Sequence, residues 1–253
     1  MSKLSFQIIS DIHFESIDKK ISTRDMIDNI TDILIIVGDV GSLEKFDRYK
    51  ELLISFCNDF KQVYLVPGNH EYYSNIIPIE TLKTYLTNLE SDIHNLKILD
   101  DEYIDLPNNF RVYGTTLWSK LTSKDAANKR LHMKSNDDLC IGNKYWINKM
   151  FFACLHNLNT IIHKSKMDNK TLIVASHYAP RYDECLDKKF YNCPYRFWYA
   201  TNLGFLMKKK NVHTWIYGHT HVNSDNILYN GTRLVSNQYK GNGYVRDKVI
   251  EVE

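Results

Sequence analysis

The chain has 253 residues, of which 43% are hydrophobic and 25% are charged. This balance is ordinary for a globular protein and excludes wholesale disorder. The 32 basic and 30 acidic side chains leave a formal net charge of +2, so no overall field attracts the protein to nucleic acid or to an anionic membrane. The longest apolar runs, such as Ile33–Val37, are far too short to span a bilayer.

Cysteine usage indicates the redox compartment. The five cysteines contain no Cys-x-x-Cys pair, and the N-terminal sequence lacks the long apolar stretch of a signal peptide. Disulfides persist mainly in oxidising compartments, so a reduced, cytoplasmic location is expected.

The first part of the chain alternates apolar strands with amphipathic helices. Strands are predicted at Leu4–Ser10, Ile33–Val37 and Val63–Val66, and helices at Leu43–Phe60 and Pro78–Leu89. A continuous β-branched run such as the second strand is typical of a strand buried on both faces. This order of elements predicts a parallel sheet with crossover helices.

The rest of the chain predicts shorter strands. They are expected at Lys97–Leu99, Tyr103–Leu106, Arg111–Thr115, Thr171–Ser176, His213–Tyr217, Asn226–Leu228, Thr232–Ser236 and Lys248–Val252, with helices at Gly142–Lys164 and Asn202–Lys209. The segment Tyr178–Tyr199 has no clean period and is dense in aromatic and basic residues. Because no repeat or linker interrupts the chain, residues 1–253 are expected to form a single domain.

Polar residues gather where the predicted strands end. Five strands are each followed by candidate ligands, which are Asp11 and His13, then Asp39, then Asn69 and His70, then His177, and last His219 and His221. Ligand sites of α/β sheets form beyond the carboxyl ends of the strands. Each motif alone is a weak signal, since a lone histidine after a strand is more often solvated. The ordered set of five favours one site.

Imidazole and carboxylate ligands together suit first-row metals such as Mn, Fe, Ni or Zn. One carboxylate can bridge two ions and so hold them roughly 3.5–4 Å apart. Within Asp11-Ile12-His13 and His219-Thr220-His221, alternate side chains share a direction if the backbone stays extended. Each pair could then bind one ion together or one ion each. Gly38, Gly68 and Gly218 precede ligands at turns where a Cβ atom would clash.

The order of these motifs resembles that of the calcineurin-like metallophosphoesterase superfamily. The matching blocks are Asp11-Ile12-His13, Gly38-Asp39, Gly68-Asn69-His70-Glu71, Ser176-His177 and Gly218-His219-Thr220-His221. They span nearly the whole chain. The resemblance implies an α/β fold, a four-layer αββα sandwich with a two-metal site at one edge.

The resemblance also implies a role for each residue. Asp11, His13 and His221 would hold the first metal, Asn69, His177 and His219 the second, and Asp39 would bridge both. His70 would bind the phosphate and protonate the leaving oxygen rather than bind metal. A metal-bridging hydroxide would attack phosphorus, while Asn69 and His70 neutralise charge. Two divalent ions are expected, manganese first among the candidates.

Other blocks resemble a bacterial-type subgroup, among them Gly114-Thr115-Thr116-Leu117-Trp118, Asn136-Asp137 and His177-Tyr178-Ala179-Pro180. The chain departs from the protein Ser/Thr phosphatases, whose G-D-x-V-D-R-G and R-G-N-H-E motifs carry arginines. Gly38-Asp39-Val40-Gly41-Ser42 has none, and Pro67 replaces the second arginine. A phosphoprotein substrate is therefore not expected.

The expected substrate is a small phosphomonoester or phosphodiester, including nucleotides. Residues 178–200 are the candidate recognition cap, with Tyr178 and Arg181 as candidate contacts, because aromatic faces stack on bases and arginine binds phosphate. The alternative, that these aromatics cover the sheet edge as core, is equally open. Tyr239, Lys240 and Tyr244 could form a loop on the rim of the site.

Two other functions remain open at this stage. A nuclease would usually add a basic DNA-binding region, which this nearly neutral chain lacks. A non-catalytic scaffold on the same fold would tend to lose ligands or His70, and the chain keeps both. The sequence predicts no membrane partner and leaves the oligomeric state open.

Overall fold

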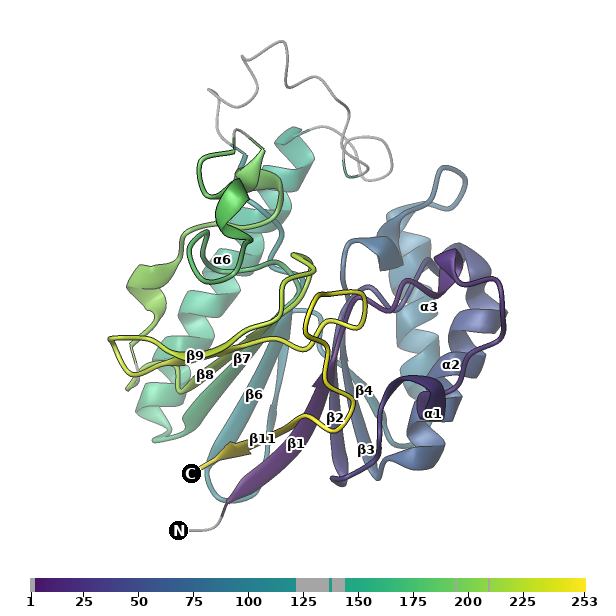
Figure 1. Cartoon of the computed structure of the whole chain (residues 1–253), viewed down its shortest axis with the longest axis horizontal. Helices are drawn as coiled ribbons and strands as arrows, with labels where there is room; N and C mark the ends of the chain where they lie inside the picture. The colour runs from purple at the N-terminus through teal and green to yellow at the C-terminus, as the bar shows by residue number, and fades with distance from the viewer. Residues whose placement is uncertain (1–2, 122–136, 138–143, 194, 209) are drawn as a thin grey trace.

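The computed structural model describes residues 3–121, 137, 144–193, 195–208 and 210–253, and it contains two β-sheets packed face to face between helices (Figure 1). The helices α1, α2 and α3 cover the outer face of one sheet, and α6 covers the outer face of the other (Figure 1). The four-layer αββα sandwich is therefore confirmed.

The first sheet has the strand order β11-β1-β2-β3-β4. Its strands are β1 (Leu4–Ile9), β2 (Ile33–Val37), β3 (Gln62–Val66), β4 (Leu96–Ile98) and β11 (Val249–Val252), and its helices are α1 (Thr23–Met26), α2 (Phe46–Asp59) and α3 (Ile79–Asp92). β1 to β4 pair in parallel, as the alternation of strands and helices predicts, and only β11 runs antiparallel, beside β1.

The second sheet has the order β5-β6-β7-β8-β10-β9. It comprises β5 (Glu102–Asp105), β6 (Phe110–Thr115), β7 (Thr171–Ser176), β8 (Thr214–Tyr217), β9 (Asp225–Ile227) and β10 (Arg233–Val235), covered by α6 (Lys144–Met167). Its four central strands are parallel, and the two edge strands are antiparallel. The carboxyl ends of the central strands therefore meet at one end of the sandwich.

The alternation of side chains along each strand divides the core into two layers. On β2, Ile35 and Val37 pack with residues of the second sheet, such as Ile173, and form the core between the sheets. Leu34 and Ile36 point the other way and pack in the cluster that contains the helix residues. This explains why β2 reads as an unbroken apolar run, because both of its faces are buried.

The sequence placed most elements to within a few residues, with two differences. The helix expected over 202–209 is wrong, since only the single 3₁₀ turn Gly204–Leu206 forms there. Leu203, Leu206 and Met207 are buried against the core in an irregular segment, and Gly204 weakens a helix at this position. The short helix α1 was not expected. Residues 142–143 and 209 lie outside the described residues.

The segment expected to be irregular contains two short 3₁₀ turns, Lys188–Phe190 and Arg196–Trp198. It is anchored by a bridge between Ala179 and Ala200. Within the described parts of the chain, no helix is both long and apolar enough to cross a bilayer.

Candidate metal centre

The seven candidate ligands converge at the carboxyl ends of β1, β2, β3, β7 and β8. Asp11, Asp39, Asn69 and His177 are buried, and His221 is the most exposed of the set. The structure therefore brings these side chains together, and their role as ligands stays a prediction. The ligand atoms fall into two neighbouring groups.

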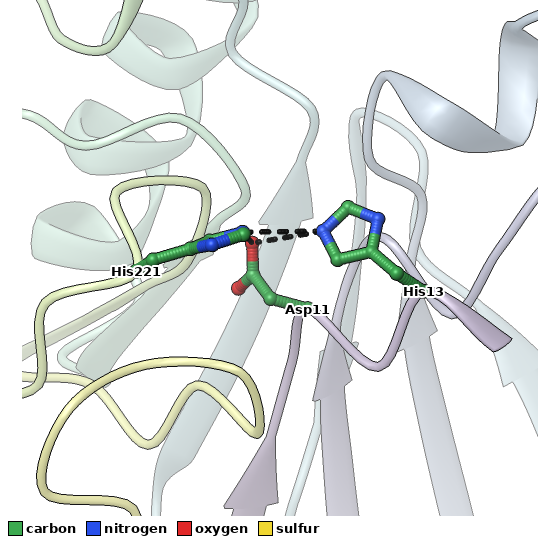
Figure 2. A group of neighbouring side chains, drawn as sticks. All are labelled: Asp11, His13 and His221. Atoms are coloured by element: carbon green, nitrogen blue, oxygen red, sulfur yellow. Dashed lines mark hydrogen bonds and ion pairs between the residues drawn. The ribbon is translucent and has the colours of Figure 1, made fainter. Parts of the chain in front are cut away.

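The first group contains Asp11, His13 and His221, whose ligand atoms face one another in Figure 2. The Nε2 atoms of His13 and His221 are 3.2 Å apart, and Asp11 Oδ1 lies 3.4 Å from His221 Nε2. Two nitrogens that each lie about 2.1 Å from a shared ion are separated by roughly 3–3.4 Å. The spacing of this group therefore fits a single ion.

The second group contains Asp39, His177 and His219, with Asn69 beside them. His177 Nε2 lies 3.2 Å from Asp39 Oδ1 and 2.9 Å from Asn69 Oδ1. A carboxylate oxygen, an amide oxygen and imidazole nitrogens are a mixed donor set that suits a divalent first-row ion.

Asp39 lies between the two groups. Its Oδ1 is 3.2 Å from His177 Nε2, and its Oδ2 is 3.6 Å from His13 Nε2. Each carboxylate oxygen thus faces a different group, which is the arrangement that a bridging ligand needs.

Backbone carbonyls orient two of the imidazoles. His177 Nδ1 lies 2.9 Å from the carbonyl oxygen of Val37, and His219 Nε2 lies 3.2 Å from that of Trp198. A carbonyl oxygen can only accept, so these nitrogens carry the protons. The other nitrogen of each ring, Nε2 of His177 and Nδ1 of His219, is the one that would give a lone pair to a bound metal.

Charges in the site shift the pKa values of its members. Burial lowers the pKa of His177, but the carboxylate of Asp39 outweighs it and raises that pKa to about 9. Burial and the nearby His177 lower the pKa of His219 to about 3, so its ring is neutral. Burial alone would raise the pKa of Asp39, but the imidazoles of His177 and His70 hold it well below its usual range. The carboxylate is therefore ionised.

The backbone at the ligands is left-handed rather than extended. Positive φ angles occur at five of the seven candidates, namely Asp11, His13, Asp39, His219 and His221. The extended backbone assumed for the paired motifs is therefore wrong. Asp11 and His13 still join one group, whereas His219 and His221 divide between the two. Such conformations cost of order 1 kcal/mol or more each and concentrate at functional sites.

The glycines before the ligands allow close approach of the loops, as the sequence predicts. At Gly68 an added Cβ atom would lie 2.6 Å from the backbone nitrogen of Asp39. At Gly38, where φ is +81°, it would lie 2.4 Å from His177 Nδ1. Any side chain at these positions would push the ligand loops apart.

Glu71 has a structural role that the sequence motif did not reveal. Its buried carboxylate accepts hydrogen bonds from the backbone N–H groups of Gly68, Asp39 and Val40, at 2.7–3.0 Å, and from the Tyr49 hydroxyl. It therefore ties the loop after β2 to the loop after β3. The clue to this role in the sequence was that Glu71 directly follows His70 in the motif.

Asp137 orients the amide of Asn69. The Asn69 Nδ2 group donates to Asp137 Oδ1 at 3.1 Å, and the hydroxyls of Tyr73 and Tyr178 donate to the same carboxylate at 2.5 and 2.8 Å. With Nδ2 held by Asp137, the amide oxygen must face His177. The sequence flagged Asn136-Asp137 only as part of a resemblance and predicted no role for it. Asn136 lies outside the described residues.

His70 lies beside both groups without joining the ligands of either. Its backbone N–H donates to Asp39 Oδ1 at 2.9 Å, and its Nδ1 lies 2.8 Å from Glu15 Oε1. Burial lowers the pKa of His70, but Asp39 and Glu15 outweigh it and raise that pKa to about 9. The ring is a quarter exposed and protonated at neutral pH, which suits a proton donor.

A cavity of about 990 Å³ opens over the two groups. One wall is formed by the irregular segment, through Leu186, Phe190, Cys193, Tyr195, Trp198 and Tyr199, and Lys240 lies on another wall. The described lining of this cavity does not include Tyr178 or Arg181. Tyr178 is fully buried beneath His219, with ring centroids 4.0 Å apart, and Arg181 forms an ion pair with Asp183.

The rim loop expected near residue 240 is present in part. Lys240 faces the cavity, and its ammonium group donates to Ser16. Tyr239 and Tyr244 instead meet edge to face and pack against the core, and the Tyr244 hydroxyl donates to the carbonyl of Met26.

Residues 4–223 match the family model of the calcineurin-like phosphoesterases. The chain belongs to this family. It is also 27% identical over 258 residues to an uncharacterized protein of Acanthamoeba polyphaga mimivirus, a match that covers 91% of this chain and 89% of that protein.

Solved structures of related enzymes share the fold. A phosphopantetheinyl hydrolase from Mycobacterium tuberculosis superposes with a TM-score of 0.69 and 18% identity, over 92% of this chain and 88% of that one. A dimetal phosphatase from Danio rerio superposes with a TM-score of 0.55 and 14% identity, over 93% and 87%. At these identities the likeness shows the fold alone.

Proposed function

We propose that the protein is a dinuclear metal-dependent phosphoesterase that hydrolyses small phosphomonoesters or phosphodiesters, including nucleotides. The observation that carries the proposal is the position of Asp39, whose two carboxylate oxygens face different groups of ligand-type side chains. A site that holds a single ion has no need of a second group on the far side of the same carboxylate.

The ligand assignment follows the two groups. Asp11, His13 and His221 would hold one ion, Asn69 Oδ1, His177 and His219 would hold the other, and Asp39 would serve both. The donor set fits manganese, iron, nickel or zinc, and manganese is the ion we propose to test first. When bound, two such ions lower the pKa of a coordinated water molecule toward neutrality and neutralise charge on the phosphoryl group.

The protein's own groups complete the chemistry. His70, with its raised pKa and partly exposed ring, is the proton donor to the leaving oxygen and a contact for the phosphate. Asn69 acts as a ligand through Oδ1. Because its Nδ2 group is held by Asp137 and Tyr73, a contact between Asn69 and substrate stays a prediction.

The aromatic wall of residues 178–200 is the proposed recognition cap. Phe190, Trp198 and Tyr199 line the cavity beside the ligands, where they can contact the organic part of a small ester. Tyr178 acts by fixing Asp137 and His219. A contact between Arg181 and the substrate stays a prediction, as does a cytoplasmic location.

The proposal is tested by hydrolysis of p-nitrophenyl phosphate and bis-p-nitrophenyl phosphate. Metal-free protein is reloaded with Mn²⁺ and compared with Asp39→Asn and His70→Ala, with metal content measured for each. Wild-type protein should turn over at least one ester only when loaded. Asp39→Asn should lose metal and activity, since the bridge loses its charge. His70→Ala should keep its metal and lose turnover by roughly 10²–10⁴-fold.

Metal uptake by the wild type without hydrolysis of either ester would contradict the proposed activity on small phosphomonoesters or phosphodiesters. Loss of metal from His70→Ala would contradict the role given to His70. The ratio of rates on the two esters decides between a monoesterase and a diesterase.

A further inference from the structure

Glu15 connects a candidate metal ligand to the proposed proton donor. It lies in the 3₁₀ turn Phe14–Ser16, two residues after His13. One of its oxygens, Oε1, is 2.8 Å from Nδ1 of His70 and 3.3 Å from Nδ1 of His13. The two rings meet edge to face, with centroids 4.3 Å apart.

An ionised carboxylate only accepts hydrogen bonds, so the two Nδ1 atoms are the donors. The Nε2 atom of each ring is then available for metal binding or for proton transfer. In His13, Nε2 is the atom that faces His221 and Asp11 in the first ligand group. In His70, Nε2 is the nitrogen not engaged by Glu15, on a ring that lines the cavity.

The surroundings hold the carboxylate in place. Its second oxygen, Oε2, is buried and has no hydrogen-bond partner in the described part of the chain. A Cβ atom at Gly41 would lie 2.6 Å from Oε2, so the chain leaves room for Glu15 by having no side chain there. A buried polar atom without a protein partner is costly, so the stability of the fold alone does not explain a glutamate at this position.

We propose that Glu15 is a positioning residue that orients His13 for metal binding and His70 for proton transfer at the same time. The inference rests on the proposed function, because it concerns the same site. Hydrogen bonds from a metal-bound imidazole to a carboxylate fix the ring and typically change metal affinity by 10–100-fold. A proton donor likewise needs a fixed ring, since its efficiency depends on reach to the leaving oxygen.

The test compares Glu15→Gln and Glu15→Ala with Glu80→Gln, a control at an exposed position outside the site. Each protein hydrolyses p-nitrophenyl phosphate and phenyl phosphate. Phenoxide is a poorer leaving group than p-nitrophenoxide, so cleavage of the phenyl ester depends more strongly on a proton donor. Both Glu15 variants should lose at least tenfold more kcat on the phenyl ester than on the p-nitrophenyl ester. In a His70→Ala background, the added Glu15 change should cause little further loss of this selectivity.

The second readout is Mn²⁺ affinity, measured by calorimetric titration. Glu15→Ala should weaken one of two binding events by about 10–100-fold, whereas Glu15→Gln should retain part of the affinity because its amide oxygen still accepts one hydrogen bond. Unchanged affinity, or equal losses on both esters that add to the His70→Ala loss, would overturn the inference. Three bound ions per wild-type chain, with one lost in Glu15→Ala, would make Glu15 a ligand instead and also overturn it.

The two proposals fail in different ways. Wild-type protein that hydrolyses neither these two monoesters nor bis-p-nitrophenyl phosphate contradicts the proposed function, and the titration then still decides whether Glu15 orients His13. Wild-type protein that hydrolyses both esters, with Glu15 variants that lose no selectivity and no affinity, contradicts only the role of Glu15.

Discussion

The Nε2 atoms of His13 and His221 lie 3.2 Å apart, although the residues are separated by 208 positions in the chain. His13 follows β1 of the first sheet and His221 follows β8 of the second, so this pair spans the interface between the sheets. A bound ion here would therefore also connect the two halves of the sandwich.

His221→Ala should reduce bound Mn²⁺ from two ions per chain to one, because it removes a nitrogen from the first group and leaves the second group complete. Metal analysis after gel filtration measures this. His156→Ala, on an exposed stretch of α6, is the matched control and should keep both ions. Retention of two tightly held ions by His221→Ala would mean that His221 is not a ligand.

Asp137→Ala should weaken Mn²⁺ binding at one site by about 10–100-fold, since the Asn69 amide loses the acceptor that turns its oxygen toward His177. It should also destabilise the fold by about 1–3 kcal/mol, because buried donors lose their partner. Tyr178→Phe is the control, since it removes one donor and keeps the bond between Asp137 and Asn69. Unchanged affinity in Asp137→Ala would show that Asn69 holds its orientation without help.

Trp198→Ala should raise KM for p-nitrophenyl phosphate by about tenfold while kcat and metal content stay unchanged. The substitution removes part of the aromatic wall but keeps the backbone carbonyl that contacts His219. Tyr229→Ala, at an aromatic position that is 95% exposed, should leave KM unchanged. A fall in kcat with constant KM would assign Trp198 to the chemistry rather than to recognition.

The stability of the metal-free protein should fall as the pH rises from about 6.5 to about 9. The pKa of folded His70 is raised from 6.5 to about 9, so its contribution is fully present below pH 6.5 and is lost as pH rises through 9. This contribution is at most about 3 kcal/mol. Urea unfolding of His70→Gln should show a smaller fall than the wild type, whereas the exposed His94→Gln should match the wild type. Parallel curves for His70→Gln and wild type would contradict the raised pKa.

The sequence by itself determined the order of elements and located the candidate ligands at the ends of strands. Ile33–Val37 reads as a buried strand because a parallel strand between two layers has apolar neighbours on both faces, and β2 matches these bounds. The candidate ligands could be located because each of them directly follows an apolar strand. The helix predicted at Asn202–Lys209 is only the short turn Gly204–Leu206, because tertiary contacts that bury Leu203, Leu206 and Met207 override the local preference.

Only the tertiary structure decided which atoms face which. The spacing alone leaves open whether His219 and His221 share an ion, and only the resemblance assigns them to different ions. In the structure the backbone is left-handed at both residues and the two side chains lie in different ligand groups. Glu15 and Asp137 acquire their roles from partners 55 and 68 residues away, His70 and Asn69 respectively. Such contacts depend on how the two sheets pack and on how the loops close over their edges, and neither leaves a periodic signal in the sequence.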